Sequence, residues 1–114
     1  MIYLSKRELA VASFATKNTH LCISVITFME ALGFQFKKSS EERTIRMICS
    51  QFEIIHLDHN IIEKVIAIKQ KKKIKLPDAI IAATAIHLKL DLITANTDDF
   101  KNIDVSLCII NPLT

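Results

Sequence analysis

Short apolar runs rich in β-branched residues alternate along the chain with longer segments whose apolar residues recur at helical spacing. The first pattern is typical of buried strands and the second of helices that pack against a sheet. Because strands that alternate with helices pair in parallel through right-handed crossovers, we expect a three-layer α/β domain with a central parallel sheet flanked by helices. Strands are expected at 21–25, 53–57, 90–94 and 105–110, and helices at 2–14, up to 32, from 39, at 59–72 and at 78–88.

Glycine and proline are scarce, with one Gly and two Pro in 114 residues, while half of the residues are hydrophobic. This composition excludes a disordered chain and a many-turned all-β fold, and the length predicts a single domain spanning residues 1–114. No apolar run reaches the ~18 residues needed to cross a bilayer. The amino terminus becomes charged at Lys6 and Arg7 before a signal-like stretch develops, so we expect a cytoplasmic protein.

Several helix boundaries are marked by capping residues. Ser24 or Thr27 is a candidate N-cap for the helix that ends at Leu32. Asp58 is a suitable N-cap for the helix at 59–72, and Pro77 fits the first turn of the helix that follows.

Three acidic residues, Glu30, Asp78 and Asp99, each have an ordinary explanation when taken alone. Glu30 suits the solvated side of a helix, Asp78 suits a helix N-terminus, and Asp99 suits a turn after a strand. In a parallel α/β sheet, however, strand carboxyl ends and the starts of the following helices share one edge. Asp78 and Asp99 both fall on that edge, and Glu30 lies just over one turn into its helix, within reach of it.

Carboxylates that converge in this way repel one another unless a cation neutralises them. Mg²⁺ or Mn²⁺ suits such a site, because these hard cations bind a few carboxylates together with water. A cation held there lowers the pKa of a bound water and clamps a phosphate, as in metal-dependent nucleases.

Segments 23–33, 76–85 and 92–100 resemble, in order and spacing, the motifs of the PIN domain family and within it the VapC-type toxins. The resemblance implies an endoribonuclease dependent on Mg²⁺ or Mn²⁺ that cleaves RNA, is neutralised by a cognate antitoxin protein and forms a homodimer.

The same resemblance implies roles for individual residues. Glu30 matches the helix glutamate of the family, and Asp78 matches the aspartate before its alanine-rich helix. Asp99 matches the acid of the family's Asn-x-x-Asp-Phe turn, with Asp98 one step out of register, so which of the two is the ligand stays open. The polar positions before this turn, Asn96 and Thr94, are expected to shape the site rather than to carry its chemistry.

The chain departs from the family at its amino terminus. Such proteins open with an apolar, central strand that carries an aspartate, whereas this chain has no aspartate before Asp58 and opens with a predicted helix. We therefore expect an N-terminally truncated domain without its first strand, whose activity in this form is in doubt. Three explanations stay open: a true start upstream of Met1, a decayed and inactive toxin remnant, or a non-catalytic interaction module that binds an antitoxin or RNA.

The net charge of +3 suits a polyanionic partner without demonstrating one. Much of the excess lies in one lysine-rich stretch at 69–75, for which a solvated helix end is favoured over phosphate contact. The three cysteines, Cys22, Cys49 and Cys108, are widely spaced among apolar neighbours and are predicted to be small buried residues rather than disulfide or zinc ligands.

Overall fold

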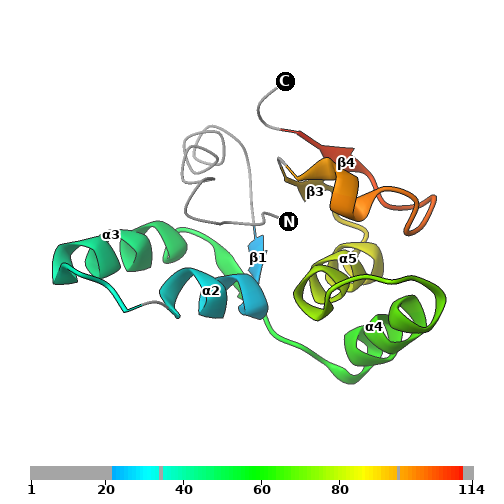
Figure 1. Ribbon diagram of the computed structural model, residues 1–114, viewed down its shortest axis with the longest axis horizontal. Coiled ribbons are helices and arrows are strands. Elements are labelled where there is room, and N and C mark those ends of the chain that lie inside the picture. Colours follow the sequence, from blue (N-terminus) through cyan, green and yellow to red (C-terminus); the bar gives the residue numbers. More distant parts are fainter. Residues whose placement is uncertain (1–21, 34, 95, 112–114) are drawn as a thin grey trace.

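The structure is a computed structural model, and it describes residues 22–33, 35–94 and 96–111 (Figure 1). The predicted helix at 2–14, with no strand before it, falls outside the described residues. Within them, short strands alternate with helices as the sequence predicts. The elements are β1 (Cys22–Ser24), α2 (Val25–Leu32), α3 (Ser39–Cys49), β2 (Glu53–Ile55), α4 (His59–Lys71), α5 (Leu76–Leu88), β3 (Leu92–Ile93), the 3₁₀ helix η2 (Thr97–Phe100) and β4 (Ile109–Ile110).

All four described strands pair in parallel, which confirms the predicted α/β class. β1 pairs with β2 so that Ile23 lies opposite Ile54, and β3 pairs with β4 so that Leu92 lies opposite Ile109. Among the described residues these strands form two separate pairs and not one continuous sheet. The two pairs nevertheless share a core, because Ile23 of β1 and Ile93 of β3 belong to one buried cluster.

Two of the predicted N-caps are confirmed. The Ser24 hydroxyl accepts a hydrogen bond from the Ile26 amide at 3.2 Å and begins α2. The Asp58 carboxylate accepts one from the Ile61 amide at 2.8 Å and begins α4. Capping by Ser24 leaves Thr27 inside α2, where its side chain is buried.

The last predicted strand, at 105–110, is much shorter than expected. Only Ile109–Ile110 is extended and paired. The reason is a turn built by Asp104, whose carboxylate accepts hydrogen bonds from the Ser106 amide at 2.9 Å and the Ser106 hydroxyl at 2.8 Å. This turn leaves Val105 fully exposed, so the apolar character of the segment does not reflect a strand.

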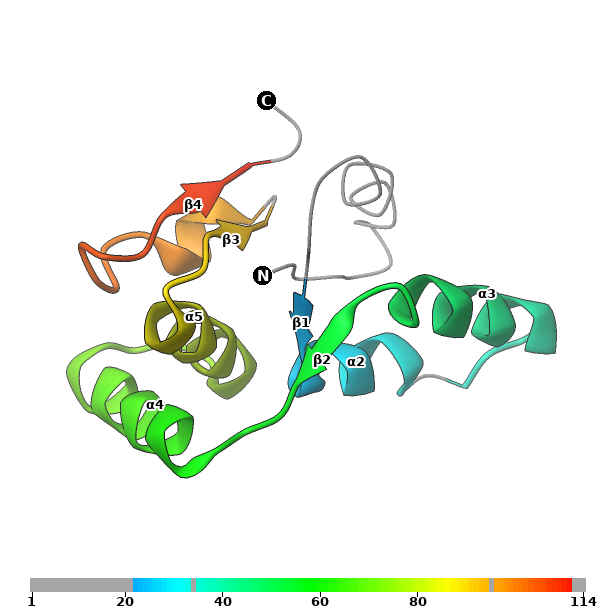
Figure 2. The same cartoon turned by 180° about the vertical axis from the view of Figure 1, so that it is seen from behind.

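The α5 helix is the most deeply buried element. Residues 78–85 are all buried, and four of them are alanines, which lets neighbouring elements approach closely. Figures 1 and 2 show α5 between α4 and the β3–β4 pair, with α3 on the far side of the β1–β2 pair. Ile80 packs toward α4, and Ile81 packs toward β3 and η2.

The thiols follow the sequence prediction in part. Cys22 and Cys49 are buried and free, as predicted, but Cys108 is exposed. Cys108 directly precedes the two-residue strand β4, which buries its own residues only partly, so the apolar neighbours of Cys108 do not cover it. No helix in the described part of the chain is long and apolar enough to cross a membrane.

Candidate functional site

Asp78 stands in the first turn of α5, where Pro77 also lies. The residue is only 7% exposed, because the rest of the helix is packed on nearly every side. It forms no ion pair with a basic residue in the described ranges. A buried carboxylate without a cationic partner is costly, and the N-terminal helix dipole offsets only part of that cost.

Glu30 lies in the second turn of α2, where the Ser24 cap places it. The residue is half-buried, and its Oε1 atom is buried with no hydrogen-bond partner among the described residues. The expectation of a fully solvated helix face, drawn from Glu30 alone, is therefore not met. One turn earlier on the same helix, the Thr27 hydroxyl is also buried without a partner. The sequence suggested Thr27 only as a cap and gave no sign of this second orphaned oxygen.

Asp99 is held by the segment that follows β3. The Asn96 Nδ2 group donates a hydrogen bond to Asp99 Oδ2 at 2.5 Å. The backbone of Asn96 is itself fixed, because its amide donates to the hydroxyl of buried Thr94 at 3.0 Å. Phe100, only 1% exposed, anchors the end of η2 in the core. The structure thus places the predicted polar positions around Asp99.

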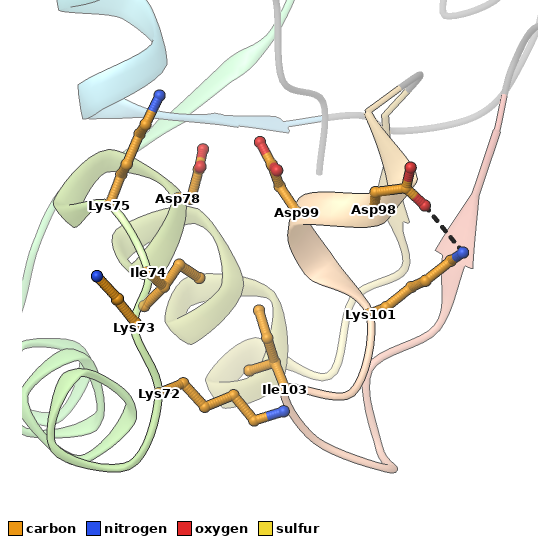
Figure 3. Close-up of a pocket in the computed structure, with 9 residues that line it drawn as sticks. All are labelled: Lys72, Lys73, Ile74, Lys75, Asp78, Asp98, Asp99, Lys101 and Ile103. Atoms are coloured by element: carbon orange, nitrogen blue, oxygen red, sulfur yellow. Dashed lines mark ion pairs between the residues drawn. The ribbon is translucent and has the colours of Figure 1, made fainter.

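Asp98 takes a different direction from Asp99. Its carboxylate forms an exposed ion pair with Lys101 at 2.8 Å (Figure 3). The hydrogen bond and the positive charge of Lys101 lower the pKa of Asp98. Figure 3 shows Asp99, by contrast, pointing beside Asp78. The sequence left these two acids undistinguished, because their order is set by the turn of η2 and by its hydrogen bonds.

The three predicted acids influence one another electrostatically. Burial raises the pKa of Glu30, and the charge of Asp78 raises it further. Burial also raises the pKa of Asp78, Asp99 adds to the increase, and Lys75 partly offsets it. Asp78 on α5 therefore interacts electrostatically with both Glu30 on α2 and Asp99 on η2.

A pocket of about 320 Å³ opens beside Asp78 and Asp99. It combines acidic and basic side chains with two isoleucines. The sequence alone does not connect the basic residues of this pocket with the acids, because the bend between α4 and α5 is needed to bring them together. The pocket is lined by Lys72, Lys73, Ile74, Lys75, Asp78, Asp98, Asp99, Lys101 and Ile103 (Figure 3).

The donor set suits a hard divalent cation. Carboxylate oxygens are the ligands that Mg²⁺ and Mn²⁺ prefer, and the buried Oε1 of Glu30 has no partner of its own. In the described part of the chain, no three His, Cys, Asp or Glu side chains come together as a ready-made metal cluster. Mg²⁺ does not need such a cluster, because it keeps several waters and binds through one or two protein carboxylates.

The chain was compared with protein families, curated proteins and solved structures. The model of the PIN domain family matches residues 2–106. No curated protein matches the chain.

Several solved structures resemble the chain over nearly its whole length. A chain of a complex from Klebsiella pneumoniae is 40% identical, with a TM-score of 0.73, over 95% of this chain and 86% of that one. VapBC2 from Rickettsia felis, bound to a DNA fragment from its promoter, has a chain 23% identical, with a TM-score of 0.75, over 94% and 86%. VapBC-1 from nontypeable Haemophilus influenzae has one 23% identical, with a TM-score of 0.73, over 100% of both. The chain therefore belongs to the PIN domain family, and its fold is that of chains in VapBC structures, which confirms the predicted VapC-like resemblance.

Proposed function

We propose that the chain is the toxin of a toxin–antitoxin system and cleaves RNA with the help of Mg²⁺ or Mn²⁺. The observation that carries the proposal is the arrangement of Glu30, Asp78 and Asp99 in a PIN domain, with burial and mutual repulsion raising the pKa of the first two. Such an arrangement destabilises the metal-free fold. A bound cation would neutralise these carboxylates and so offset that cost.

Glu30, Asp78 and Asp99 are the residues that would hold the cation. When bound, it would lower the pKa of a water molecule and stabilise the charge that develops on a phosphate. The neighbouring residues support this role. Asn96 orients the Asp99 carboxylate through its 2.5 Å hydrogen bond, and Thr94 fixes the backbone of Asn96. Asp98 is engaged by Lys101 and takes no direct part.

We further propose that the chain binds an antitoxin protein and acts in the cytoplasm. The 40% identical chain comes from a toxin–antitoxin complex, which supports a cognate antitoxin for this chain as well. A homodimer and a cytoplasmic location, where RNA is available, complete the proposal. The proposed site would belong to the single domain predicted for residues 1–114.

Replacement of Asp78 by asparagine tests the activity. The purified chain is incubated with an RNA mixture in Mn²⁺, in Mg²⁺ or in EDTA, and the products are separated by electrophoresis. We expect cleavage that requires the cation and that Asp78→Asn abolishes, with an unchanged circular dichroism spectrum. Asp98→Asn is the matched control, because it removes an exposed carboxylate from the same pocket and should leave cleavage intact. Undiminished cleavage by Asp78→Asn refutes the assignment.

A non-catalytic interaction module is the second candidate. It is favoured by the lack of any aspartate before Asp58, where the PIN domain family is expected to carry one. Antitoxin binding without any cation-dependent cleavage by the unmodified chain would select this function.

A further inference from the structure

The last turn of α4 and its connection to α5 are unusually basic, with lysines at 69, 71, 72, 73 and 75. Two of them have tasks within the protein. Lys69 donates a hydrogen bond from Nζ to the Ile74 carbonyl at 2.7 Å and so fixes the bend. Lys71 acts electrostatically on Asp104, together with Lys64, and does not line the pocket beside Asp78. Lys72, Lys73 and Lys75 form no ion pair with any described residue, and we call these three the lysine wall.

The backbone determines how the lysine wall is presented. Lys72 and Lys75 both have extended backbone angles. Ile74 packs against the core cluster of α4 and α5, which contains Ile61 and Ala79. Because successive side chains of an extended segment point to opposite sides, the inward Ile74 directs Lys73 and Lys75 outward, where both are exposed.

The lysine wall lines the same pocket as Asp78 and Asp99. Figure 3 shows the Lys75 ammonium beside Asp78, the Lys72 ammonium below Ile103 and the Lys73 ammonium on the side away from Asp99, so the three charges are spread out and do not converge on one point. Lys75 acts on Asp78 electrostatically without forming an ion pair with it. The lysine wall therefore offsets the charge of Asp78 only in part, through Lys75, and otherwise leaves positive charge unpaired beside the acids.

A row of this kind matches an extended polyanion better than a small anion. Ammonium groups spread along a segment cannot converge on one phosphate, but they can each meet a different phosphate of a strand. The polyanion would otherwise be repelled by Asp78 and Asp99. We propose that Lys72, Lys73 and Lys75 bind successive backbone phosphates of single-stranded RNA and guide it to the acidic site; this inference rests on the proposed ribonuclease function.

RNA binding without cleavage tests the lysine wall. Binding of a labelled single-stranded uridine oligonucleotide is measured by fluorescence anisotropy in EDTA, over a series of salt concentrations. The test variant carries Lys72→Gln, Lys73→Gln and Lys75→Gln. The matched control carries Lys37→Gln, Lys38→Gln and Lys89→Gln, which removes the same charge from exposed positions before α3 and after α5. Thermal unfolding confirms that both variants fold.

We expect the test variant to bind roughly tenfold or more weakly and to lose about 2 from the slope of log K against log salt, since each single-strand phosphate contact contributes about 0.7. The control should keep the affinity and slope of the unmodified chain. Equal losses in both variants, or no loss in either, overturn the proposal, and so does tighter binding of the DNA oligonucleotide of the same sequence than of the RNA. Binding that depends on the wall, in a chain that does not cleave RNA in Mn²⁺, supports this inference while refuting the proposed nuclease.

Discussion

Asp78→Asn is predicted to stabilise the metal-free protein although it removes a charge from a favourable helix terminus. Loss of the interaction with the α5 N-terminus costs about 0.3–1 kcal/mol. Against this stand the burial of Asp78 and the repulsion from Asp99, which together raise its pKa and so disfavour its charged form in the fold. Asparagine has the same shape and leaves no cavity. Burying a polar group without its hydrogen bonds costs roughly 1–3 kcal/mol. This exceeds the contribution of the helix terminus, so we expect a net gain on the order of 1 kcal/mol, or roughly 4 °C in Tm for a domain of this size.

A divalent cation should reverse the order of the two proteins. A ligand that binds only the folded state at 100 times its Kd adds about 2.7 kcal/mol of stability, which corresponds to roughly 10 °C in Tm. The unmodified chain should therefore become more stable than Asp78→Asn once Mn²⁺ is added, because the variant lacks a carboxylate that we propose binds the cation.

Differential scanning calorimetry of both proteins, in EDTA and in increasing Mn²⁺, measures this crossover. Asp98→Asn provides the control, since Asp98 is exposed and paired with Lys101, and its Tm should respond to Mn²⁺ as the unmodified chain does. The reasoning is refuted if Asp78→Asn is less stable than the unmodified chain in EDTA, or if it gains as much as that chain from Mn²⁺.

Two further predictions concern the carboxylates and the caps. Without metal, the raised pKa values of Glu30 and Asp78 mean that the folded state holds protons which the unfolded chain has released. The stability of the fold should therefore decrease as pH rises from about 4 toward neutrality. Tm measured in EDTA across this range checks the prediction, and a Tm that rises with pH contradicts it. Asp58→Ala removes the hydrogen bond to the Ile61 amide and should cost about 0.5–2 kcal/mol, as urea unfolding will show, whereas Asp58→Asn, which keeps a capping oxygen, should cost less.

The sequence predicted best those features that depend on neighbours along the chain. The Ser24 and Asp58 caps are local hydrogen bonds between residues two and three apart, and both were correctly located. Pro77 also falls in the first turn of α5, as predicted, although the helix begins slightly earlier, at Leu76. Turns that depend on side-chain hydrogen bonds were harder to predict. Asp104 forms such a turn in a segment whose hydrophobic residues alone predict a strand.

Features that depend on distant parts of the chain were predicted only in outline. The positions of Glu30, Asp78 and Asp99 in the predicted elements indicated a shared edge of the sheet. They did not indicate that Asp78 would interact electrostatically with each of the other two acids. The lysine-rich stretch was favoured as a solvated helix end. Only the bend between α4 and α5, fixed by the bond from Lys69 to the Ile74 carbonyl, brings the lysine wall beside the acids.

The destabilising acid and the most buried helix of the protein belong to the same element. Asp78 opens α5, and the alanines behind it are fully buried against α4 and the β3–η2 segment. Close packing of these small side chains prevents the helix from shifting to expose the carboxylate, because any shift would open cavities along its whole length. The repulsion between Asp78 and Asp99 is therefore retained in the fold and is relieved only by protonation or by a cation. Cation binding at the proposed site and folding stability should therefore be linked through α5. Ala82→Leu, one helical turn after Asp78, should weaken both by forcing that helix out of place, and a lower Tm in EDTA with a smaller gain in Tm from Mn²⁺ would show it.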